Sequence, residues 1–531
     1  MSSTWLVNAL SGSPDNYAPT LDDTTEVSFL DTTLRDGEQM PGVSLAPDEK
    51  ADIADALDAA GVDVIEAGSA PTSDGEREGI ARVADLGLDA TVTSFARGVR
   101  ADVDRALDCG VDGVNLVVPA SDRHIETKVG TTREGVLDTT ADLVAYAREH
   151  GLWVEVLGED GSRGDLDFLD DLARTAFDAG ADRVCYCDTV GAASPERTYE
   201  AVSRLAEHGP TSTHTHDDLG FAVANVHASL VAGADLVHAT VNGVGERAGN
   251  VALEEVAVAL SECYGIETLT LEHLSGLARQ VADATGVYPA PNKAVVGDNA
   301  FAHESGIHTD GTLKDETMYE PYPPELVGRE RRLVLGKHAG RAGVEAALRD
   351  LGFDPDDDEL GAVVARVKEL GDRGKRVTDA DLRAVAADEL DRGRDRRVEL
   401  RALTATSGDG IPTASVRLAV DGEEHTAAGT GSGPVDAAMN AVREALADDD
   451  ARLDSYHVDA VTGGTDAVVT VEVTMRRGDR RVTVSAADAD ITRASVQAAV
   501  DALDRLLADE ARDDDGTPEG GAVRPADSGD D

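Results

Sequence analysis

The sequence predicts an α/β protein that consists of a (β/α)8 TIM barrel, a helical linker and a duplicated βββα domain. Short apolar, β-branched runs alternate eight times with stretches of helical period over about 240 residues, which is the length of a TIM barrel. This alternation stops near residue 290. From residue 395 a different pattern begins, in which three strands and a helix occur twice in succession.

The eight predicted barrel strands lie at 26–31, 62–67, 90–95, 112–118, 152–157, 182–187, 211–216 and 235–241. A helix is expected after each, at 47–60, 74–86, 100–109, 131–149, 165–179, 195–207, 220–232 and 251–263. Glycine closes several of these helices, for example Gly61 and Gly180, because it tolerates the left-handed conformation of a helix C-terminus. An open, doubly wound sheet is the alternative, but no glycine-rich phosphate-binding fingerprint follows the first strand.

The remaining segments complete the predicted organisation. The expected segments are a flexible N-terminal arm at 1–24, the barrel domain at 25–289, linker subdomains at 290–392, the duplicated domain at 393–508 and a disordered acidic tail at 509–531. Short helices are expected within 340–392. The duplicated domain has expected strands at 396–405, 413–420, 424–428, 453–461, 467–476 and 480–485, with helices at 434–447 and 491–508.

The chain is strongly acidic, and this excludes several classes of partner. It has 48 Lys and Arg residues against 103 Asp and Glu residues, a net charge of −55. Binding to nucleic acid or to an anionic membrane requires clustered basic residues, so neither is expected. The four cysteines form no CxxC pair, no apolar run reaches the ~18 residues of a membrane span, and no basic residue precedes Arg35. These features predict a protein of the reducing cytoplasm.

The same charge predicts a salt requirement. The acidic residues are spread along the whole chain, as in proteins adapted to a salt-rich, halophilic cytoplasm. Near-molar salt shortens the Debye length to about 3 Å and screens their mutual repulsion. We therefore expect molar KCl to raise both the melting temperature and the activity. Full stability and activity at ~50 mM salt would contradict this interpretation.

Polar residues gather where the predicted strands end, which is where TIM barrels carry their active sites. Arg35 and Asp36 follow the first strand, Glu66 ends the second, Glu159 follows the fifth, Thr189 follows the sixth, His214 and His216 lie on the seventh, and Asn250 follows the eighth. These are the candidate catalytic, substrate-binding and metal-ligating residues.

His214 and His216 are two residues apart on a strand, so both rings should face the barrel interior. With Asp36 they form a two-histidine, one-carboxylate set that suits Mn²⁺, Mg²⁺, Zn²⁺ or Fe²⁺, and Asn250 could add an amide oxygen. A pair of hydrogen-bonded rim histidines is the alternative.

The other candidates have an alternative structural role as well. Arg35, beside a metal, is interpreted as an oxyanion stabiliser instead of half of a surface ion pair. Glu66 and Glu159 could tie strand ends together instead of acting on substrate. Thr189 could cap a turn or donate its hydroxyl to a substrate carboxylate.

Several long motifs, in order, resemble those of a known enzyme family. They are DTTLRDGEQ at 31–39, CDTVG at 187–191, HTHDDLG at 214–220, NGVGERAGN at 242–250 and FAHESGIH at 301–308. They are similar to motifs of the 2-isopropylmalate, citramalate and homocitrate synthases, barrel enzymes that condense acetyl-CoA with a 2-oxo acid. The resemblance covers about residues 26–508, and the duplicated unit resembles the family's allosteric amino-acid-binding domain.

The resemblance implies a role for each candidate. The metal ligands fall on Asp36, His214 and His216, with a fourth contact from Asn250; Arg35 stabilises the enolate, Thr189 binds the oxo-acid carboxylate, and Glu159 is the acidic rim residue. His308 and Tyr319 match linker residues that reach the partner's barrel, so a homodimer is expected. His308, oriented by Glu159 or Tyr319, is the expected base. Isoleucine or leucine is the expected effector, and the turns at 431–434 and 463–466 are expected to bind it, with a plain connection as the alternative for each.

The segment after Glu66 bears on the choice of oxo acid. Isopropylmalate synthases usually continue Phe-Pro after the glycine, whereas this chain reads Ser69-Ala70-Pro71. It looks more like the archaeal citramalate synthases, which use pyruvate. 2-Isopropylmalate and homocitrate synthases are the alternatives within the family. A hydroxymethylglutaryl-CoA lyase and a catalytically silent amino-acid sensor are the alternatives outside it.

Overall fold

The computed structural model describes residue 21 and residues 23–315, 318–372, 377–390, 396–407, 410–447, 450–460, 469–478, 480–488 and 490–514. Its contacts divide the chain into two compact units. The first runs to Ala302 and includes Asp315–Arg332, and the second contains His303–Lys314 and the residues from Leu333 onward. The boundaries expected between the barrel, linker and duplicated domains stay predictions.

The first unit contains a closed barrel of eight parallel strands in which β1 pairs with both β2 and β8. The strands are β1 (Ser28–Asp31), β2 (Val64–Glu66), β3 (Thr91–Arg97), β4 (Gly113–Pro119), β5 (Trp153–Glu159), β6 (Arg183–Asp188), β7 (Thr211–Thr215) and β8 (Leu236–Ala239). Closure confirms the predicted TIM barrel and excludes the open sheet.

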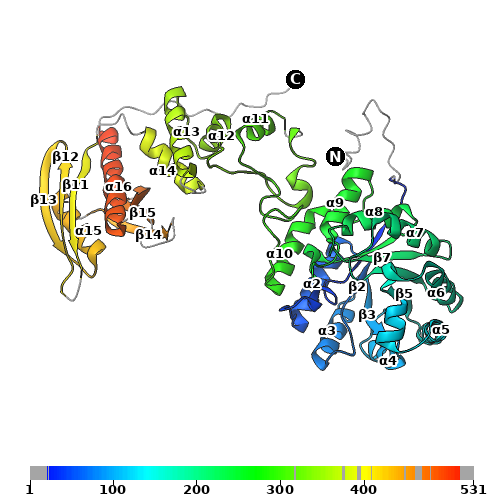
Figure 1. Ribbon diagram of the computed structural model, residues 1–531. Coiled ribbons are helices and arrows are strands. Elements are labelled where there is room, and N and C mark those ends of the chain that lie inside the picture. Colours follow the sequence, from blue (N-terminus) through cyan, green and yellow to red (C-terminus); the bar gives the residue numbers. More distant parts are fainter. Residues whose placement is uncertain are drawn as a thin grey trace, which may run out of the picture. The chain divides into compact units, whose positions relative to one another are not determined.

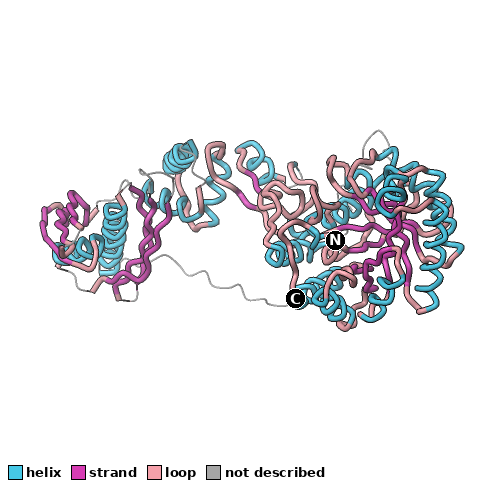
Figure 2. The backbone as a smooth tube through the Cα atoms, turned by 60° about the horizontal axis from the view of Figure 1, so that its bottom comes forward, coloured by secondary structure: helices cyan, strands magenta, loops and turns pink. Residues whose placement is uncertain are grey.

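Helices surround the strands, as Figures 1 and 2 show. They are α2 (Pro47–Ala60), α3 (Asp74–Ala84), α4 (Arg100–Asp108), α5 (Arg133–Glu149), α6 (Leu166–Asp178), α7 (Pro195–Ala206), α8 (Ala222–Val231) and α9 (Leu253–Tyr264), followed by α10 (Leu274–Thr285). Their limits have local causes. Pro47 occupies the first turn of α2, and Gly61 ends that helix with a φ of 92°. Ser194 caps α7 by accepting a hydrogen bond from the backbone N–H of Arg197.

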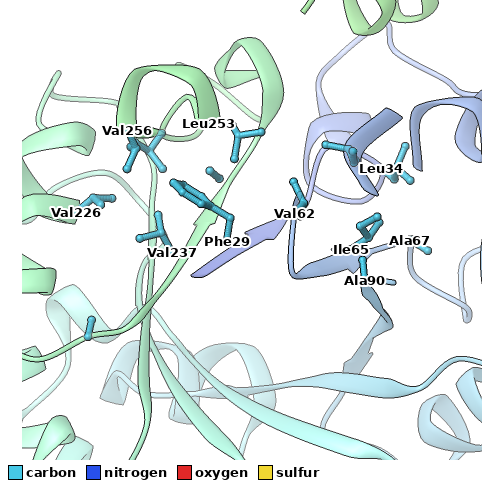
Figure 3. Close-up of a cluster of buried hydrophobic side chains, with 14 of the residues drawn as sticks. Phe29, Leu34, Val62, Ile65, Ala67, Ala90, Val226, Val237, Leu253 and Val256 are labelled. Atoms are coloured by element: carbon cyan, nitrogen blue, oxygen red, sulfur yellow. The ribbon is translucent and has the colours of Figure 1, made fainter. Parts of the chain in front are cut away.

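The barrel core is built from apolar side chains of both layers. In Figure 3, Phe29 lies beside Val226, Val237, Leu253 and Val256, where β1 and β8 meet α8 and α9. Leu34, Ile65, Ala67 and Ala90 gather on the β2 side of the same view. This packing holds the carboxyl ends of the strands together, so the loops that follow them converge on one rim.

The second unit has two cores. Helices α11 (Gly306–Lys314), α12 (Arg341–Asp350), α13 (Asp357–Asp372) and α14 (Asp379–Leu390) precede the duplicated part. One core joins α12, α13 and α14 through Val344, Val363 and Leu382. Short strands β9 (Ala302–His303) and β10 (Arg332–Leu333) lie at the division between the units.

The C-terminal part contains two copies of a βββα motif, as predicted. Antiparallel strands β11 (Val398–Thr406), β12 (Thr413–Val420) and β13 (Glu423–Thr430) precede α15 (Pro434–Leu446); β14 (Arg452–Ala460), β15 (Val469–Arg477) and β16 (Arg480–Asp488) precede α16 (Ile491–Asp514). A single apolar core joins both repeats and contains Val416 and Val442 from the first and Val473 and Val500 from the second. The repeats therefore form one folded body.

Three features differ from the expectations. Helix α10 was not predicted, and α11 lies in the linker before residue 340, where no helix was predicted. Helix α16 continues to Asp514, beyond the expected end at residue 508. Residues 1–20 and 22 of the predicted arm, and residues 515–531 of the predicted tail, lie outside the described residues.

The described residues also include short helical turns, several of which directly follow barrel strands. These are η1 (Gly37–Gln39), η2 (His124–Val129, a π-helix), η3 (Gly161–Arg163), η4 (Val241–Gly243), η5 (Leu271–His273) and η7 (Pro324–Val327). Within the described ranges, none of the helices combines the length and apolar character needed to cross a bilayer.

Candidate metal centre and active site

Asp36, His214 and His216 come together at the carboxyl ends of β1 and β7. Asp36 Oδ2 lies 3.2 Å from His214 Nε2 and 3.7 Å from His216 Nε2, and the two Nε2 atoms are 3.3 Å apart. All three residues are buried. One carboxylate oxygen and two imidazole nitrogens converging at these distances can bind one divalent ion.

Electrostatics keeps Asp36 and His216 in forms that can bind a metal. Burial alone would raise the pKa of Asp36, but the Arg35 charge and the two histidines hold it well below its usual range. Burial and then the neighbouring His214 lower the pKa of His216 to about 4. At neutral pH Asp36 is therefore a carboxylate and His216 a neutral ring with a free lone pair, as metal ligation requires.

Asn250 fits the predicted fourth contact. It pairs with His216 in an isolated antiparallel bridge, which brings the loop after β8 to the end of β7. Its amide Nδ2 donates to Val244 O at 3.2 Å. Its Oδ1 is buried and has no hydrogen-bond partner among the described residues. A buried carbonyl oxygen without a donor is costly, and a cation would satisfy it.

Arg35 lies beside this cluster and is held in place by Glu66. Arg35 Nε donates to Glu66 Oε2 at 2.5 Å, Arg35 Nη1 lies 3.4 Å from Asp36 Oδ2, and the guanidinium lies over the Phe95 ring at 4.6 Å. Burial opposes the charge, but Glu66 and Asp36 raise the pKa of Arg35 above its usual value. The cation is therefore permanent and has a defined orientation.

Glu66 is fully buried and accepts hydrogen bonds from three side chains. Besides Arg35, Thr32 Oγ1 donates to it at 2.6 Å and Asn115 Nδ2 at 2.7 Å. Both carboxylate oxygens are thus engaged by the protein. This arrangement favours a role for Glu66 in orienting Arg35 over direct contact with substrate.

Glu159 and Thr189 lie in a second part of the rim. Glu159 Oε2 is 3.1 Å from His124 Nδ1, and its Oε1 accepts from Lys128 Nζ at 2.5 Å. Thr189 Oγ1 accepts a hydrogen bond from the backbone N–H of Asp160 at 2.8 Å. Since a hydroxyl can accept and donate at once, Thr189 can still donate to a carboxylate.

His308 and Tyr319 lie outside the metal-ligand cluster. His308 is an exposed residue of α11, in the second contact unit. Tyr319 is 43% exposed in a turn of the first unit. Their predicted catalytic roles stay predictions.

The structure also contains functional candidates that the sequence patterns did not single out. His124 and Lys128 belong to η2, after β4, where we had selected no residue; the ionisable residues in the segment DRHIETK were an available signal. In the barrel interior His238 Nε2 lies 3.0 Å from Glu155 Oε2, and Cys185 is close to both. The alternation of side chains along β8 places His238 in the barrel interior with its partners.

Three family models match the chain in succession. They are HMGL-like over residues 26–281, homocitrate synthase post-HMGL domain-like over 295–375, and LeuA allosteric (dimerisation) domain over 376–507. A solved HMG-CoA lyase from Bacillus subtilis is similar over 51% of this chain and 98% of its own, with 21% identity and a TM-score of 0.47.

Curated relatives are similar over nearly the whole length. The CimA protein of Methanothermobacter thermautotrophicus is 53% identical over 489 residues, covering 91% of this chain and 99% of the relative. The (R)-citramalate synthase CimA of Methanocaldococcus jannaschii is 48% identical over 488 residues, covering 91% and 99%. With identity of this extent over nearly the full length of both chains, the chain belongs to the (R)-citramalate synthase family.

Proposed function

We propose that this protein condenses acetyl-CoA with pyruvate to form (R)-citramalate and CoA, a step towards isoleucine. The observation that carries the proposal is the buried Asp36–His214–His216 cluster with the Arg35 cation beside it, at the catalytic rim of the barrel. The similarity to the (R)-citramalate synthase of Methanocaldococcus jannaschii supports pyruvate as the oxo acid.

A divalent metal, with Mn²⁺, Mg²⁺ and Zn²⁺ as the candidates, would be held by Asp36, His214, His216 and Asn250. When bound, it supplies a Lewis acid that polarises the keto group of the oxo acid. Thr189 would donate its hydroxyl to the carboxylate of pyruvate, since its oxygen already accepts from Asp160 N–H. The substrate is thereby oriented at both ends.

Arg35 would stabilise the enolate of acetyl-CoA. A base removes one methyl proton, and the resulting negative charge on the thioester oxygen is offset by the buried guanidinium. The enolate carbon then attacks the keto carbon of pyruvate, and water cleaves the thioester to release CoA. Glu66 contributes by fixing the direction of the guanidinium.

His308 is our candidate for the base, with Glu159 or Tyr319 orienting it or a water molecule. The LeuA allosteric (dimerisation) match supports a homodimer. That this linker region serves the partner's barrel is what the family resemblance implies. Glu159 contacts His124 and Lys128, and these contacts would fix the direction of its carboxyl group.

The substrate proposal predicts a clear preference among oxo acids. We expect pyruvate to exceed 2-oxoisovalerate by at least about tenfold in kcat/KM, because discrimination of one or two methyl groups is worth about 1–3 kcal/mol. The measurement is thiol release from acetyl-CoA with pyruvate, 2-oxoisovalerate or 2-oxoglutarate. A preference for 2-oxoisovalerate would indicate leucine synthesis. Absence of release with all three, together with cleavage of hydroxymethylglutaryl-CoA, would indicate a lyase.

The C-terminal part of the chain is proposed to bind the amino-acid effector. A cavity of about 200 Å³ lies between the two repeats, lined by Leu403, Ala405, Ser407, Pro434, Asp490, Thr492 and Arg493. Asp490 and Arg493 have opposite charges, as recognition of an amino-acid zwitterion requires. Pro434 ends the Gly431–Pro434 turn, one of two turns predicted to bind an effector; the other, 463–466, lies outside the described residues.

This proposal predicts that isoleucine inhibits the full chain and that truncation removes the inhibition. The separate cores of the barrel and of the repeats support a chain ending near residue 392 that still folds and condenses. Coupling of about 1–3 kcal/mol is ordinary for such control. Thiol release is measured with and without isoleucine or leucine. Equal inhibition of both forms would assign the effector to the barrel.

A further inference from the structure

We propose that Lys50 is a positioning residue that links the loop carrying Arg35 and Asp36 to the loop after Glu66, and thereby couples metal binding to oxo-acid selection. The inference rests on the proposed function, because oxo-acid selection presupposes the condensation. It concerns a residue on α2 that is 1% exposed and outside the metal-ligand cluster.

The Lys50 ammonium is surrounded by four oxygen acceptors. Its Nζ lies 2.7 Å from Glu38 Oε2, 2.8 Å from Glu76 Oε2, 2.9 Å from Leu34 O and 3.4 Å from Ala67 O. An ammonium has three N–H donors, so the three short contacts can use all of them. Two contacts come from the β1–α2 loop and two from the β2–α3 segment.

On the first side, Lys50 holds the residues that flank the metal-binding pair. Leu34 immediately precedes Arg35, and Glu38 lies two residues after Asp36. The other oxygen of Glu38 accepts from Leu45 N–H at 2.8 Å, which closes the loop before α2 begins. Displacement of this loop would move Arg35 and Asp36 together.

On the second side, Lys50 holds the segment that follows Glu66 at the carboxyl end of β2, which the family resemblance links to the choice of oxo acid. Glu76 Oε1 accepts from Ser69 N–H at 2.9 Å, so the carboxylate joins Lys50 to the start of Ser69-Ala70-Pro71. Gly68 has a φ of 153°, and an added Cβ would overlap Glu76 Oε1. The backbone can therefore approach Glu76 only because residue 68 is glycine.

The site is specific for lysine, although arginine supplies most of the positive charge in this chain. A Cβ on Gly79 would lie 3.1 Å from Lys50 Cδ, so the stem already fills the space available. A guanidinium would need more room and would not direct three donors from one atom. A buried ion pair contributes little net stability. We therefore infer that the contacts of Lys50 with the two loops serve to position those loops.

The test uses three variants of the full-length protein and two measurements. Lys50→Met removes the whole link, Glu38→Gln weakens only the metal-binding side, and Glu76→Gln weakens only the Ser69 side. Mn²⁺ affinity is measured without substrate by EPR. The selectivity ratio is kcat/KM for pyruvate divided by kcat/KM for 2-oxoisovalerate.

We expect Mn²⁺ affinity and the selectivity ratio to respond to different variants. Glu38→Gln should weaken Mn²⁺ binding about tenfold, as is usual for residues that orient a metal ligand, and leave the selectivity ratio within about twofold. Glu76→Gln should lower the selectivity ratio about fivefold and leave Mn²⁺ affinity within about twofold. Lys50→Met should change both and lower kcat about tenfold. Arg183→Met is the matched control, since Arg183 pairs with Asp235 at the opposite ends of the strands and should change neither.

Unchanged Mn²⁺ affinity and selectivity in Lys50→Met would overturn the proposal, as would equal changes in Arg183→Met. If Lys50→Met does not fold, the two glutamine variants still test the proposal. Identical effects of Glu38→Gln and Glu76→Gln on Mn²⁺ affinity and on the selectivity ratio would contradict it. A wild-type protein that binds Mn²⁺ but does not condense pyruvate would contradict the proposed function alone.

Discussion

Replacement of His214 or His216 by alanine is expected to abolish turnover and leave the fold intact. Each variant loses one imidazole nitrogen from a cluster whose members lie 3.2–3.7 Å apart. Lewis-acid stabilisation is worth several kcal/mol, so activity should fall by about 10³-fold or more. The folded circular dichroism spectrum should persist because both rings lie at the rim and their removal leaves the barrel core unchanged.

The measurement compares thiol release after chelation and return of Mn²⁺ with Mn²⁺ affinity in the same samples. His208→Ala is a suitable control, since His208 pairs with Asp170 and precedes the amino end of β7. Full activity in His214→Ala or His216→Ala would contradict the assignment of that histidine as a metal ligand. Loss of activity with undiminished Mn²⁺ affinity would move that histidine from metal ligand to catalytic group.

Arg35→Met is expected to give the next largest effect, a reduction of kcat by about 10²–10³-fold, as found when an oxyanion-stabilising donor is removed. The guanidinium is held by Glu66 and Phe95, so its reorganisation energy is small when negative charge develops on the enolate. Because this interaction forms mainly in the transition state, KM for pyruvate should change much less than kcat.

Arg35→Lys separates charge from geometry. Lysine keeps the positive charge but cannot reproduce both the Nε contact to Glu66 and the stacking on Phe95. We expect it to recover only a small part of the lost kcat. Arg148→Met, which removes the contact to Asp182 between α5 and β6, is the control and should retain activity. A tenfold rise in KM with unchanged kcat would instead assign Arg35 to ground-state binding.

Local signals predicted much of the barrel. Helix α2 was expected at 47–60 and is found there. Pro47 in its first turn and Gly61 directly after its last residue mark both ends in the local sequence. Helix α10 was missed because eight βα pairs were already complete before residue 274. The end of helix α16 was predicted too early, because its acidic last turns have the composition of a disordered tail.

The identity of the rim residues also followed from the sequence, and their partners did not. His214 and His216 are two apart on a strand, and Asp36 follows the first strand, so a shared rim was predictable. The contacts of Glu66 with Asn115, of Glu159 with His124 and of Lys50 with Glu76 join residues 49, 35 and 26 positions apart in the sequence. No periodicity or local propensity encodes such pairs.

The element types, the barrel class and the candidate metal-binding residues were predictable from local patterns, because hydrophobic period, glycine and proline positions and strand-end chemistry are local properties. The way those residues are held became visible in three dimensions: Glu66 orients Arg35, Asn250 presents an oxygen with no hydrogen-bond partner among the described residues, and Lys50 lies between two loops. These relations depend on barrel closure, which brings distant loops to one rim and buries their charges where each must find a partner.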